Sequence, residues 1–335
     1  MISDILISEN IKGAAVDRLT SQFSVSFLPD LWKDPKALAA KIGSFRALIV
    51  RNQTQVTAEV LKAATHLEVI GRAGVGLDNI DIEAATRAGV LVTYTPDQNA
   101  VSAAELTMGL ILSLARKIPA AAEDTRQGNW NRQNFHGIEL HGKTIGIVGA
   151  GKIGYLTAQR ARSFGMRILA YDPFISPDSI LLSELSAELV ELDELLARAD
   201  VLSLHLPAAP DTVGFFNASK FAKMKAGAYF VNTSRGEVVI EQNLLDALKS
   251  GQIAGAALDV RCQEPPTRNE LETLPNVILT PHIAAFTKEA QARVTRAVCD
   301  DVARALMGKP ARNPANQVAP RAKKCPESIA SESMR

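Results

Sequence analysis

A glycine-rich segment in the middle of the chain constrains the fold most strongly. Gly149-Ala150-Gly151-Lys152-Ile153-Gly154 follows an apolar run at 144–148 and precedes a stretch with helical spacing at 153–164. This is a G-x-G-x-x-G pattern in a strand–turn–helix setting. Gly149 permits a tight turn, Gly151 lets backbone approach a pyrophosphate, and Gly154 allows the helix to pack closely on the strand. The pattern predicts an α/β domain with a phosphate at a helix N-terminus.

An acidic residue lies at the expected distance from this loop. Asp172 ends the next apolar run, 167–171, about 20 residues after Gly151. A carboxylate there can accept hydrogen bonds from both ribose hydroxyls of NAD and would repel a 2′-phosphate. A glycine turn and an Asp172-Pro173 turn would explain each feature separately. Strand, helix and spaced acid together favour NAD binding.

The rest of the chain alternates between apolar runs and helical stretches, which is typical of parallel β-sheets covered by helices. With 335 residues, 47% of them hydrophobic, the chain is long enough for two domains. The segment 101–122 is rich in Ala and Leu and breaks only at Pro119, which predicts two helices or one kinked helix. Strands are predicted at 5–7, 25–28, 47–50, 67–70, 91–94, 144–148, 167–171, 201–205, 228–231, 254–260 and 277–280, and further helices at 11–20, 35–42, 57–64, 82–88, 153–164, 192–197 and 288–307.

The position of the glycine loop predicts an inserted domain. We expect two Rossmann/flavodoxin-like parallel-sheet domains of the α/β class. Residues 100–285 would form the NAD-binding domain, inserted into a substrate-binding (catalytic) domain made of 1–99 and 286–318. The active site is expected in the cleft between them. Residues 319–335, rich in Pro, Ala, Lys, Arg and Ser, are predicted to be a disordered tail.

Composition excludes several classes of function. Lys and Arg total 37 against 36 Asp and Glu, so a net charge of +1 argues against a protein that binds nucleic acid or a membrane surface. The N-terminus has no basic and apolar leader, and the longest apolar stretch, 106–115, is about half as long as a membrane span requires. Three Cys and five His without paired ligand spacing predict no metal site and a cytoplasmic protein.

Three loops after predicted strands carry the groups that hydride reduction of a 2-oxo acid requires. Such a reaction needs a cation for the carboxylate, an acid–base group at the carbonyl oxygen, and a partner that sets the pKa of that group. Arg235 lies in the loop 232–236, Glu264 in 259–265 and His282 in 280–285. Each could alone be an ordinary loop residue. Together with the glycine loop, they favour a catalytic interpretation.

With these loops, the segments 71–79 (GRAGVGLDN), 102–105 (SAAE) and 140–144 (LHGKT) carry a family resemblance. From about residue 3 to 318, the chain resembles the D-isomer-specific 2-hydroxyacid dehydrogenases, and within them the D-3-phosphoglycerate dehydrogenase branch most closely. The resemblance implies an NAD-dependent oxidoreductase that interconverts a D-type 2-hydroxy acid and its 2-oxo acid, with 3-phosphoglycerate and 3-phosphohydroxypyruvate as the first choice. It also implies a homodimer formed through helices such as 101–122.

The resemblance assigns a role to individual residues. Arg235 would clamp the substrate carboxylate and carbonyl, His282 would exchange a proton with the 2-oxo group, and Glu264 would pair with the imidazole. Asp259 would bind the nicotinamide carboxamide, and backbone N–H groups of Val75 and Gly76 the substrate carboxylate. The implied cofactor-binding residues are Gly149, Gly151, Lys152, Ile153, Gly154, Asp172, Leu206, Thr233, Ser234, Asp259 and Ala284. The implied substrate-binding residues are Arg51, Asn52, Val75, Gly76 and Arg235.

Several positions depart from the pattern of the family, and they leave the substrate open. Asn52 replaces a Ser, Ala284 a Gly and Phe286 a Ser or Thr, and Arg261 stands where Phe is frequent. These changes add bulk and charge near the substrate without altering the catalytic residues. An anionic three-carbon acid, 3-phosphoglycerate or 3-sulfolactate, suits Arg51 and Arg261, whereas reduction of hydroxypyruvate or glyoxylate is the less charged alternative.

The roles of Arg51 and Arg132 are open, and two rival functions share the fold. Arg132 resembles a residue that reaches the cleft of a neighbouring subunit, but it and Arg51 could equally be solvated charges. A formate dehydrogenase would carry Gln in place of Glu264, whereas an NAD(H)-sensing corepressor stays an alternative. His205 is expected to be structural. We expect no regulatory domain after residue 318 and therefore no feedback through one.

Overall fold

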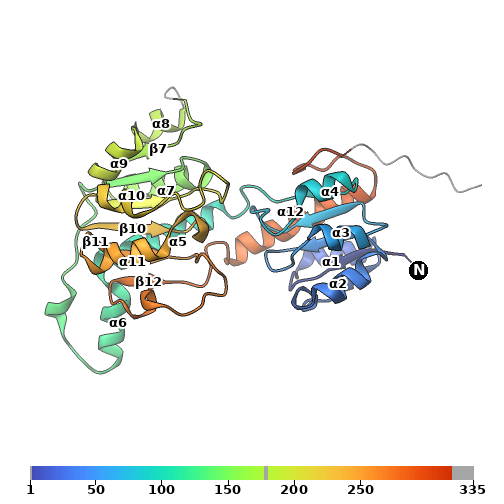
Figure 1. Cartoon of the computed structure of the whole chain (residues 1–335), viewed down its shortest axis with the longest axis horizontal. Coiled ribbons are helices and arrows are strands. Elements are labelled where there is room, and N and C mark those ends of the chain that lie inside the picture. Colours follow the sequence, from blue (N-terminus) through green and yellow to red (C-terminus); the bar gives the residue numbers. More distant parts are fainter. Residues whose placement is uncertain (1, 177–179, 319–335) are drawn as a thin grey trace, which may run out of the picture. The chain divides into compact units, whose positions relative to one another are not determined.

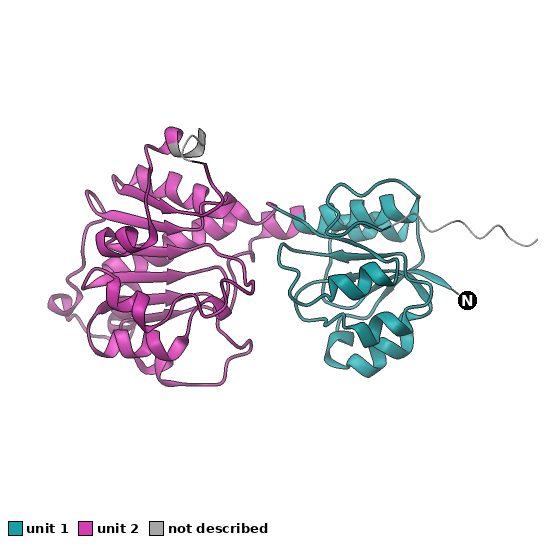
Figure 2. Cartoon of the chain, turned by 45° about the horizontal axis from the view of Figure 1, so that its top comes forward, with its two compact units in different colours: residues 1–96, 294–335 teal, residues 97–293 magenta. Residues whose placement is uncertain are grey.

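The computed structural model describes residues 2–176 and 180–318, so the predicted tail at 319–335 lies outside the described residues. The chain divides into two compact units (Figure 2). The first runs to Pro96 and resumes at Val294, and the second spans Asp97–Arg293. The assignment of 1–99 with 286–318 to substrate binding stays a prediction. Among the described residues, no helix is both long and apolar enough to cross a membrane.

The first unit is a five-stranded parallel sheet in the order β2-β1-β3-β4-β5, the flavodoxin-like order. Different helices cover its two faces. Because successive residues of a strand point to opposite sides, each strand contributes side chains to both faces. In β1, Leu6 packs with α2 and α3, whereas Ile5 and Ile7 pack with α1 and α12. The elements, which can be followed in Figure 1, are β1 (Ser3–Ile7), α1 (Ala14–Thr20), β2 (Val25–Phe27), η1 (Leu31–Lys33), α2 (Pro35–Ile42), β3 (Phe45–Val50), α3 (Ala58–Ala63), β4 (Val69–Arg72), α4 (Ile82–Arg87), β5 (Leu91–Thr93) and the part of α12 (Lys288–Leu306) that follows Arg293.

A glycine allows α12 to pack closely on this sheet. A Cβ on Gly71 in β4 would lie 2.5 Å from a methyl carbon of Val302 and 2.7 Å from one of Val298. Only a residue without a side chain fits beneath these two valines of α12. The last long helix of the sequence is thereby part of the core of the first unit.

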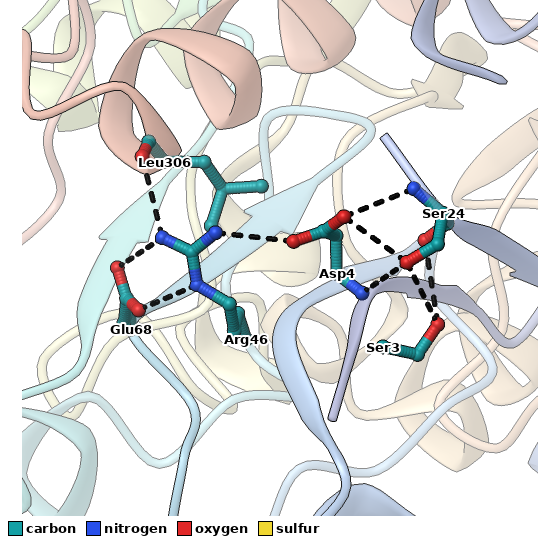
Figure 3. A network of polar contacts seen from close by, with 6 residues as sticks. All are labelled: Ser3, Asp4, Ser24, Arg46, Glu68 and Leu306. Atoms are coloured by element: carbon teal, nitrogen blue, oxygen red, sulfur yellow. Dashed lines mark hydrogen bonds and ion pairs between the residues drawn. The ribbon is translucent and has the colours of Figure 1, made fainter. Parts of the chain in front are cut away.

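Arg46 ties the C-terminal end of α12 to the strands (Figure 3). Its guanidinium donates to Glu68 (Nε–Oε1, 2.8 Å), to Asp4 (Nη1–Oδ1, 3.1 Å) and to the carbonyl of Leu306 (3.3 Å). Asp4 in turn accepts hydrogen bonds from the backbone and hydroxyl of Ser24, and these bonds, together with Arg46, lower the pKa of Asp4 although burial opposes them. The network joins β1, β3 and the helix end.

The second unit is a seven-stranded parallel sheet in the order β12-β11-β10-β9-β6-β7-β8. The helices α5 and α7 cover one face and α9, α10 and α11 the other. The strands are β6 (Thr144–Val148), β7 (Arg167–Tyr171), β8 (Glu188–Leu189), β9 (Val201–Leu204), β10 (Ala228–Asn232), β11 (Ile253–Leu258) and β12 (Val277–Leu279). The helices are α5 (Ala100–Arg116), α6 (Ile118–Arg126), η2 (Arg132–Phe135), α7 (Lys152–Ser163), α8 (Ile180–Leu185), α9 (Leu192–Arg198), α10 (Ala218–Lys223), η3 (Gly236–Val238), α11 (Glu241–Lys249) and η4 (Glu270–Thr273).

The strand order of this sheet places a ligand site. The order reverses between β6 and β9, and in open parallel sheets ligands bind beyond the carboxyl ends of the strands at such a switch point. Because all paired strands run parallel, the loops after β6, β7, β9, β10, β11 and β12 emerge at the same edge. The predicted fold class, α/β with two parallel-sheet domains, is confirmed.

The segment predicted as two helices or one kinked helix is two helices. Helix α5 ends at Arg116, and Lys117 adopts a left-handed conformation (φ 52°) before α6 begins. Pro119 therefore lies in the first turn of α6, where its missing N–H is tolerated, and the break precedes it.

Candidate active site

The glycine loop after β6 has the geometry that a dinucleotide requires. A Cβ on Gly149, which has φ 90°, would lie 2.6 Å from the carbonyl oxygen of His205, and one on Gly154 would lie 2.2 Å from the carbonyl oxygen of Gly149. Gly149 and Gly154 are thus demanded by the packing of the protein itself. By contrast, a Cβ on Gly151 would meet no atom within 4 Å. That open space at the start of α7 leaves room for a pyrophosphate, and its contact with Gly151 stays a prediction.

Asp172 is oriented beside this loop by backbone contacts. Its Oδ2 accepts a hydrogen bond from the amide of Ala150 (2.9 Å) and its Oδ1 one from the amide of Phe174 (2.9 Å). A carboxylate oxygen can accept two hydrogen bonds, so both oxygens keep capacity for ribose hydroxyls. Lys152 and Ile153 form the first turn of α7, and Leu206 packs beside Gly149. These residues fit an NAD molecule at the switch point.

The loop after β10 folds around the side chain of Asn232. Its Oδ1 accepts hydrogen bonds from the amide (3.0 Å) and hydroxyl (2.7 Å) of Ser234, and its Nδ2 donates to the carbonyl of Arg235 (2.8 Å). Thr233 is fixed from the other side by a hydroxyl–hydroxyl bond to Thr107 of α5 (2.8 Å). The tight turn carries Arg235, whose Nη1 also donates to the carbonyl of Ser234 (2.8 Å).

The loop after β11 touches the loop of Arg235 through backbone atoms. A Cβ on Gly236 would lie 2.0 Å from the carbonyl carbon of Arg261. No other residue allows this approach, which explains the Arg-Gly pair at the end of β10. The charge of Arg235 contributes to lowering the pKa of Glu264, so the two side chains are within electrostatic reach.

Asp259 holds the loop after β12. Its buried carboxylate accepts hydrogen bonds from the Thr280 hydroxyl (2.6 Å) and from the amides of Ile283 (2.9 Å) and Ala284 (2.8 Å). Its carbonyl accepts from the amide of His282 (2.8 Å). Sequence reasoning missed this anchoring role, although an Asp directly after a buried strand was a signal for it. A contact of Asp259 with nicotinamide stays a prediction.

His282 and Glu264 meet through a short hydrogen bond. The distance from Nδ1 of His282 to Oε2 of Glu264 is 2.6 Å, and His282 adopts φ 53°, a conformation rare outside glycine. Both side chains are about one-third exposed, at 36% and 34%. Because Glu264 occupies Nδ1, the opposite nitrogen, Nε2, is the one that can exchange a proton with a substrate.

Glu264 is kept ionised by its surroundings. Burial raises the pKa of Glu264, but the hydrogen bond and charge of His282, the amide of Arg261 (3.2 Å from Oε1) and the charge of Arg235 outweigh burial. The pKa of Glu264 therefore lies below its ordinary value. An ionised carboxylate at Nδ1 fixes the orientation of the imidazole and so the direction in which Nε2 points.

Arg261 does not offer its charge to a ligand. Its side chain is only 7% exposed and lies between Glu241 (Nη2–Oε2, 2.9 Å) and Glu272 (Nη1–Oε1, 2.7 Å). The prediction that Arg261 adds positive charge for an anionic substrate is wrong. The two carboxylates come from positions far from Arg261 in sequence.

Two other groups of the second unit are explained by burial. The His205 residue is partly exposed, but its ring is surrounded by protein atoms. The resulting desolvation lowers the pKa of the ring to about 3. Its Nε2 contacts the hydroxyl of Ser203 (3.0 Å), so it is a neutral, structural histidine at neutral pH. Burial and the charges of Glu241 and Glu237 raise the pKa of the Cys262 thiol, so it is a weak nucleophile.

The residues predicted to bind substrate in the first unit lie at the carboxyl ends of β3 and β4. Glu9, itself buried, accepts hydrogen bonds from the amides of Arg51 (2.8 Å), Gln53 and Thr54. Burial lowers the pKa of Arg51, although the charge of Glu9 opposes this. Asn52 is exposed. Glu9 thus fixes the backbone of the loop that carries the half-buried Arg51.

The loop after β4 carries Val75 and Gly76. It turns at Gly74 (φ 154°), where a Cβ would lie 1.7 Å from Nη1 of Arg72. The buried guanidinium of Arg72 therefore fills the space beneath this turn. Because β3 and β4 are parallel, this loop and that of Arg51 lie at one edge of the sheet. Contact of Val75 and Gly76 with a carboxylate stays a prediction.

Comparison with known proteins places the chain in a family. Residues 108–284 match the model described as "D-isomer specific 2-hydroxyacid dehydrogenase, NAD binding domain". The chain belongs to the D-isomer-specific 2-hydroxyacid dehydrogenase family. The predicted family and the predicted cofactor, NAD, are thereby confirmed.

Individual relatives agree with this assignment. The chain is 42% identical to D-3-phosphoglycerate dehydrogenase of Archaeoglobus fulgidus over 314 residues, which is 93% of this chain and 59% of that protein. The structure of the TT0316 protein from Thermus thermophilus has a TM-score of 0.88 and 34% identity, covering 93% of this chain and 100% of the other. A glyoxylate reductase from Paecilomyes thermophila has a TM-score of 0.84 and 30% identity, covering 94% and 98%. The chain spans only 57–59% of the length of the first three curated relatives.

Proposed function

We propose that this protein is an NAD-dependent dehydrogenase that interconverts a D-type 2-hydroxy acid and its 2-oxo acid. The observation that carries the proposal is the His282–Glu264 hydrogen bond of 2.6 Å, and the loop of Glu264 adjoins the turn of Arg235. An ionised Glu264, a histidine with one free ring nitrogen and an arginine together supply what the chemistry needs.

In the direction of reduction, each residue has one task. The guanidinium of Arg235 donates to the substrate carboxylate and to the carbonyl oxygen, a two-pronged contact that a lysine could not form. NADH, when bound, supplies the hydride to the carbonyl carbon. Nε2 of His282 donates its proton to the carbonyl oxygen, so the C=O bond becomes CH–OH and NAD⁺ remains. Glu264 stabilises the imidazolium before transfer, and neutral His282 acts as the base in oxidation.

We propose 3-phosphohydroxypyruvate and 3-phosphoglycerate as the substrate pair. The identity to D-3-phosphoglycerate dehydrogenase and the rigid loop of Arg51 support this choice. Arg51 would bind the phosphate, with Arg132 of a second subunit as a further candidate. Arg261 is engaged by two carboxylates and is therefore no longer a candidate for binding the phosphate. Sulfopyruvate would use the same cations, whereas similarity to a glyoxylate reductase favours the smaller substrates glyoxylate or hydroxypyruvate.

We also propose a cytoplasmic homodimer. Helix α6 has no buried residue, and Figure 1 shows it and the following segment extending from the sheet of its unit. Ile118 is 50% exposed and Trp130 80%, and such apolar side chains suit an interface with a second copy. Cys262 and Cys299 are both free thiols, which fits a reducing compartment. Light scattering after size exclusion would test the dimer, and a species of 36.0 kDa alone would refute it.

The test is a panel of initial rates of NADH oxidation. Phosphohydroxypyruvate, sulfopyruvate, hydroxypyruvate and glyoxylate are offered at equal concentrations. We expect turnover, with the highest kcat/KM for phosphohydroxypyruvate. Preference for another member changes the substrate but keeps the reaction. NADH binding without turnover of any member would refute the proposed activity and support the NAD(H)-sensing corepressor.

A further inference from the structure

The loop that carries Glu264 is anchored by an ionic cluster around the buried guanidinium of Arg261. The guanidinium of Arg261 uses all three of its nitrogens. Nε and Nη2 donate to Oε1 (3.0 Å) and Oε2 (2.9 Å) of Glu241, and Nη1 donates to Oε1 of Glu272 (2.7 Å). Glu241 is the first residue of α11 and Glu272 belongs to η4, so Arg261 joins two separate elements.

The two carboxylates also hold neighbouring backbone. Oε1 of Glu241 accepts from the amide of Cys262 (2.8 Å) and its Oε2 from Nδ2 of Asn269 (3.2 Å). Oε2 of Glu272 accepts from the amide of Asn269 (2.8 Å) in a capping box. Every oxygen of both carboxylates therefore has a partner, and together they satisfy the buried guanidinium of Arg261. The hydrogen bonds lower the pKa of both Glu241 and Glu272, although burial opposes this, most strongly for Glu241.

The backbone of Arg261 contacts both sides of the catalytic group. Its amide donates to Oε1 of Glu264 (3.2 Å), the carboxylate that binds His282 through its other oxygen. Its carbonyl group lies against Gly236, where a Cβ would come within 2.0 Å of the carbonyl carbon. A shift of the Arg261 backbone would therefore move Glu264 and press on the turn that carries Arg235.

We propose that Arg261, clamped between Glu241 and Glu272, is a positioning residue that holds Glu264 and the turn of Arg235 in place for proton transfer. This inference rests on the proposed function of the same site. The side chain of Arg261 is engaged by protein carboxylates and acts on the reaction only through Glu264 and Arg235. Small displacements of catalytic groups are costly, since a misplacement of about 1 Å can reduce a rate about 100-fold.

The test compares variants of the full chain. Arg261→Met removes the anchor but leaves two carboxylates without their cation, which can unfold the protein. The neutral variant Arg261→Met/Glu241→Gln/Glu272→Gln removes all three charges together and keeps similar shapes. Arg198→Met is the matched control, because Arg198 also bridges two glutamates, Glu188 and Glu194, beside β8 at the other edge of the seven-stranded sheet.

The expected result has three parts. In the neutral variant kcat falls about 10- to 100-fold, while the KM for NADH stays within about twofold of the parent. Glu264 faces the charges of His282 and Arg235 and accepts a hydrogen bond from the amide of Arg261. Loss of that hydrogen bond raises the pKa of Glu264, so the acid limb of the kcat profile moves to higher pH. Arg261→Lys, which keeps the charge but not the two-pronged bond, recovers part of the kcat that Arg261→Met loses.

A neutral variant that is folded, as judged by its melting curve, and keeps the kcat and pH profile of the parent would overturn the proposal. So would an equal loss in Arg198→Met, or no recovery in Arg261→Lys. If the parent itself turns over no 2-oxo acid, the proposed function fails separately. Crystal structures then decide the positioning role. Retention of the 3.2 Å and 2.6 Å contacts of Glu264 in the neutral variant would refute it, and their loss would support it.

Discussion

Two alanine substitutions in the glycine loop should separate folding from cofactor binding. In Gly154→Ala the new Cβ would lie 2.2 Å from the carbonyl oxygen of Gly149 and 3.0 Å from a methyl carbon of Ile147. Relief requires α7 to move from β6 by about 1 Å, and such overpacking costs about 1–3 kcal/mol. The intrinsic preference of a helix for Ala over Gly returns about 1 kcal/mol at most. A contact of 2.2 Å with a backbone oxygen puts the cost at the upper end of that range, so the net loss is about 2 kcal/mol. We therefore expect a lower melting temperature, by about 4–8 °C for a unit of this size.

Gly151→Ala should behave in the opposite way. The new Cβ meets no protein atom within 4 Å, and Gly151 has φ −66° and ψ −166°, which alanine adopts freely. The free energy of unfolding should stay within about 0.5 kcal/mol of the parent. The methyl group would occupy the space in which the pyrophosphate fits, so affinity for NADH should fall at least about tenfold, or about 1.4 kcal/mol.

Both variants can be measured by thermal denaturation and by the fluorescence of bound NADH. Gly151→Ala that binds NADH as tightly as the parent would refute the placement of the pyrophosphate. Gly154→Ala that melts with the parent would refute the packing argument.

Three further perturbations follow from the structure. Arg51→Met should raise the KM for phosphohydroxypyruvate at least about tenfold more than the KM for glyoxylate in initial-rate assays, and equal changes would remove Arg51 from the phosphate site. His205→Asn should make the free energy of unfolding less sensitive to acid, because the pKa of His205 is about 3 in the folded chain against 6.5 in the unfolded chain, so that only the unfolded chain takes up the proton as pH falls from 6.5 towards 3. Urea unfolding at about pH 7 and pH 5 would show whether the variant lacks the loss of stability that the parent shows. Arg46→Met should lower the free energy of unfolding, measured in urea, by about 1–2 kcal/mol. The control Arg87→Met breaks an exposed pair with Glu83 and should change it by less than about 0.5 kcal/mol, and equal effects would contradict the network of Figure 3.

The local patterns predicted most of the architecture. Strands such as 144–148 and 167–171 match β6 and β7 residue for residue, because all of β6 and residues 168–170 of β7 are buried and rich in apolar side chains, as central parallel strands are. Helix α11 was not among the predicted elements, although Leu244, Leu245 and Leu248 carry helical spacing. Strand β8 has only two residues, too few for a pattern.

The side-chain partners were harder to infer. The break between α5 and α6 falls at Lys117 rather than at Pro119, because proline is compatible with a first helical turn. Arg261 was expected to face a ligand, since residue type alone does not reveal that Glu241 and Glu272 enclose it. Such partners depend on which loops the parallel sheet brings to one edge. Local sequence patterns do not reveal this, because it is set by the tertiary fold.

The most direct test of the account is the turnover of His282→Ala with the best 2-oxo acid of the panel. We expect kcat to fall about 100- to 10,000-fold, which is the usual contribution of a general acid, while the dissociation constant for NADH stays within about twofold of the parent. Parent-like kcat in a variant that lacks the imidazole would show that another group protonates the carbonyl oxygen, and the proposed role of the His282–Glu264 pair would be wrong.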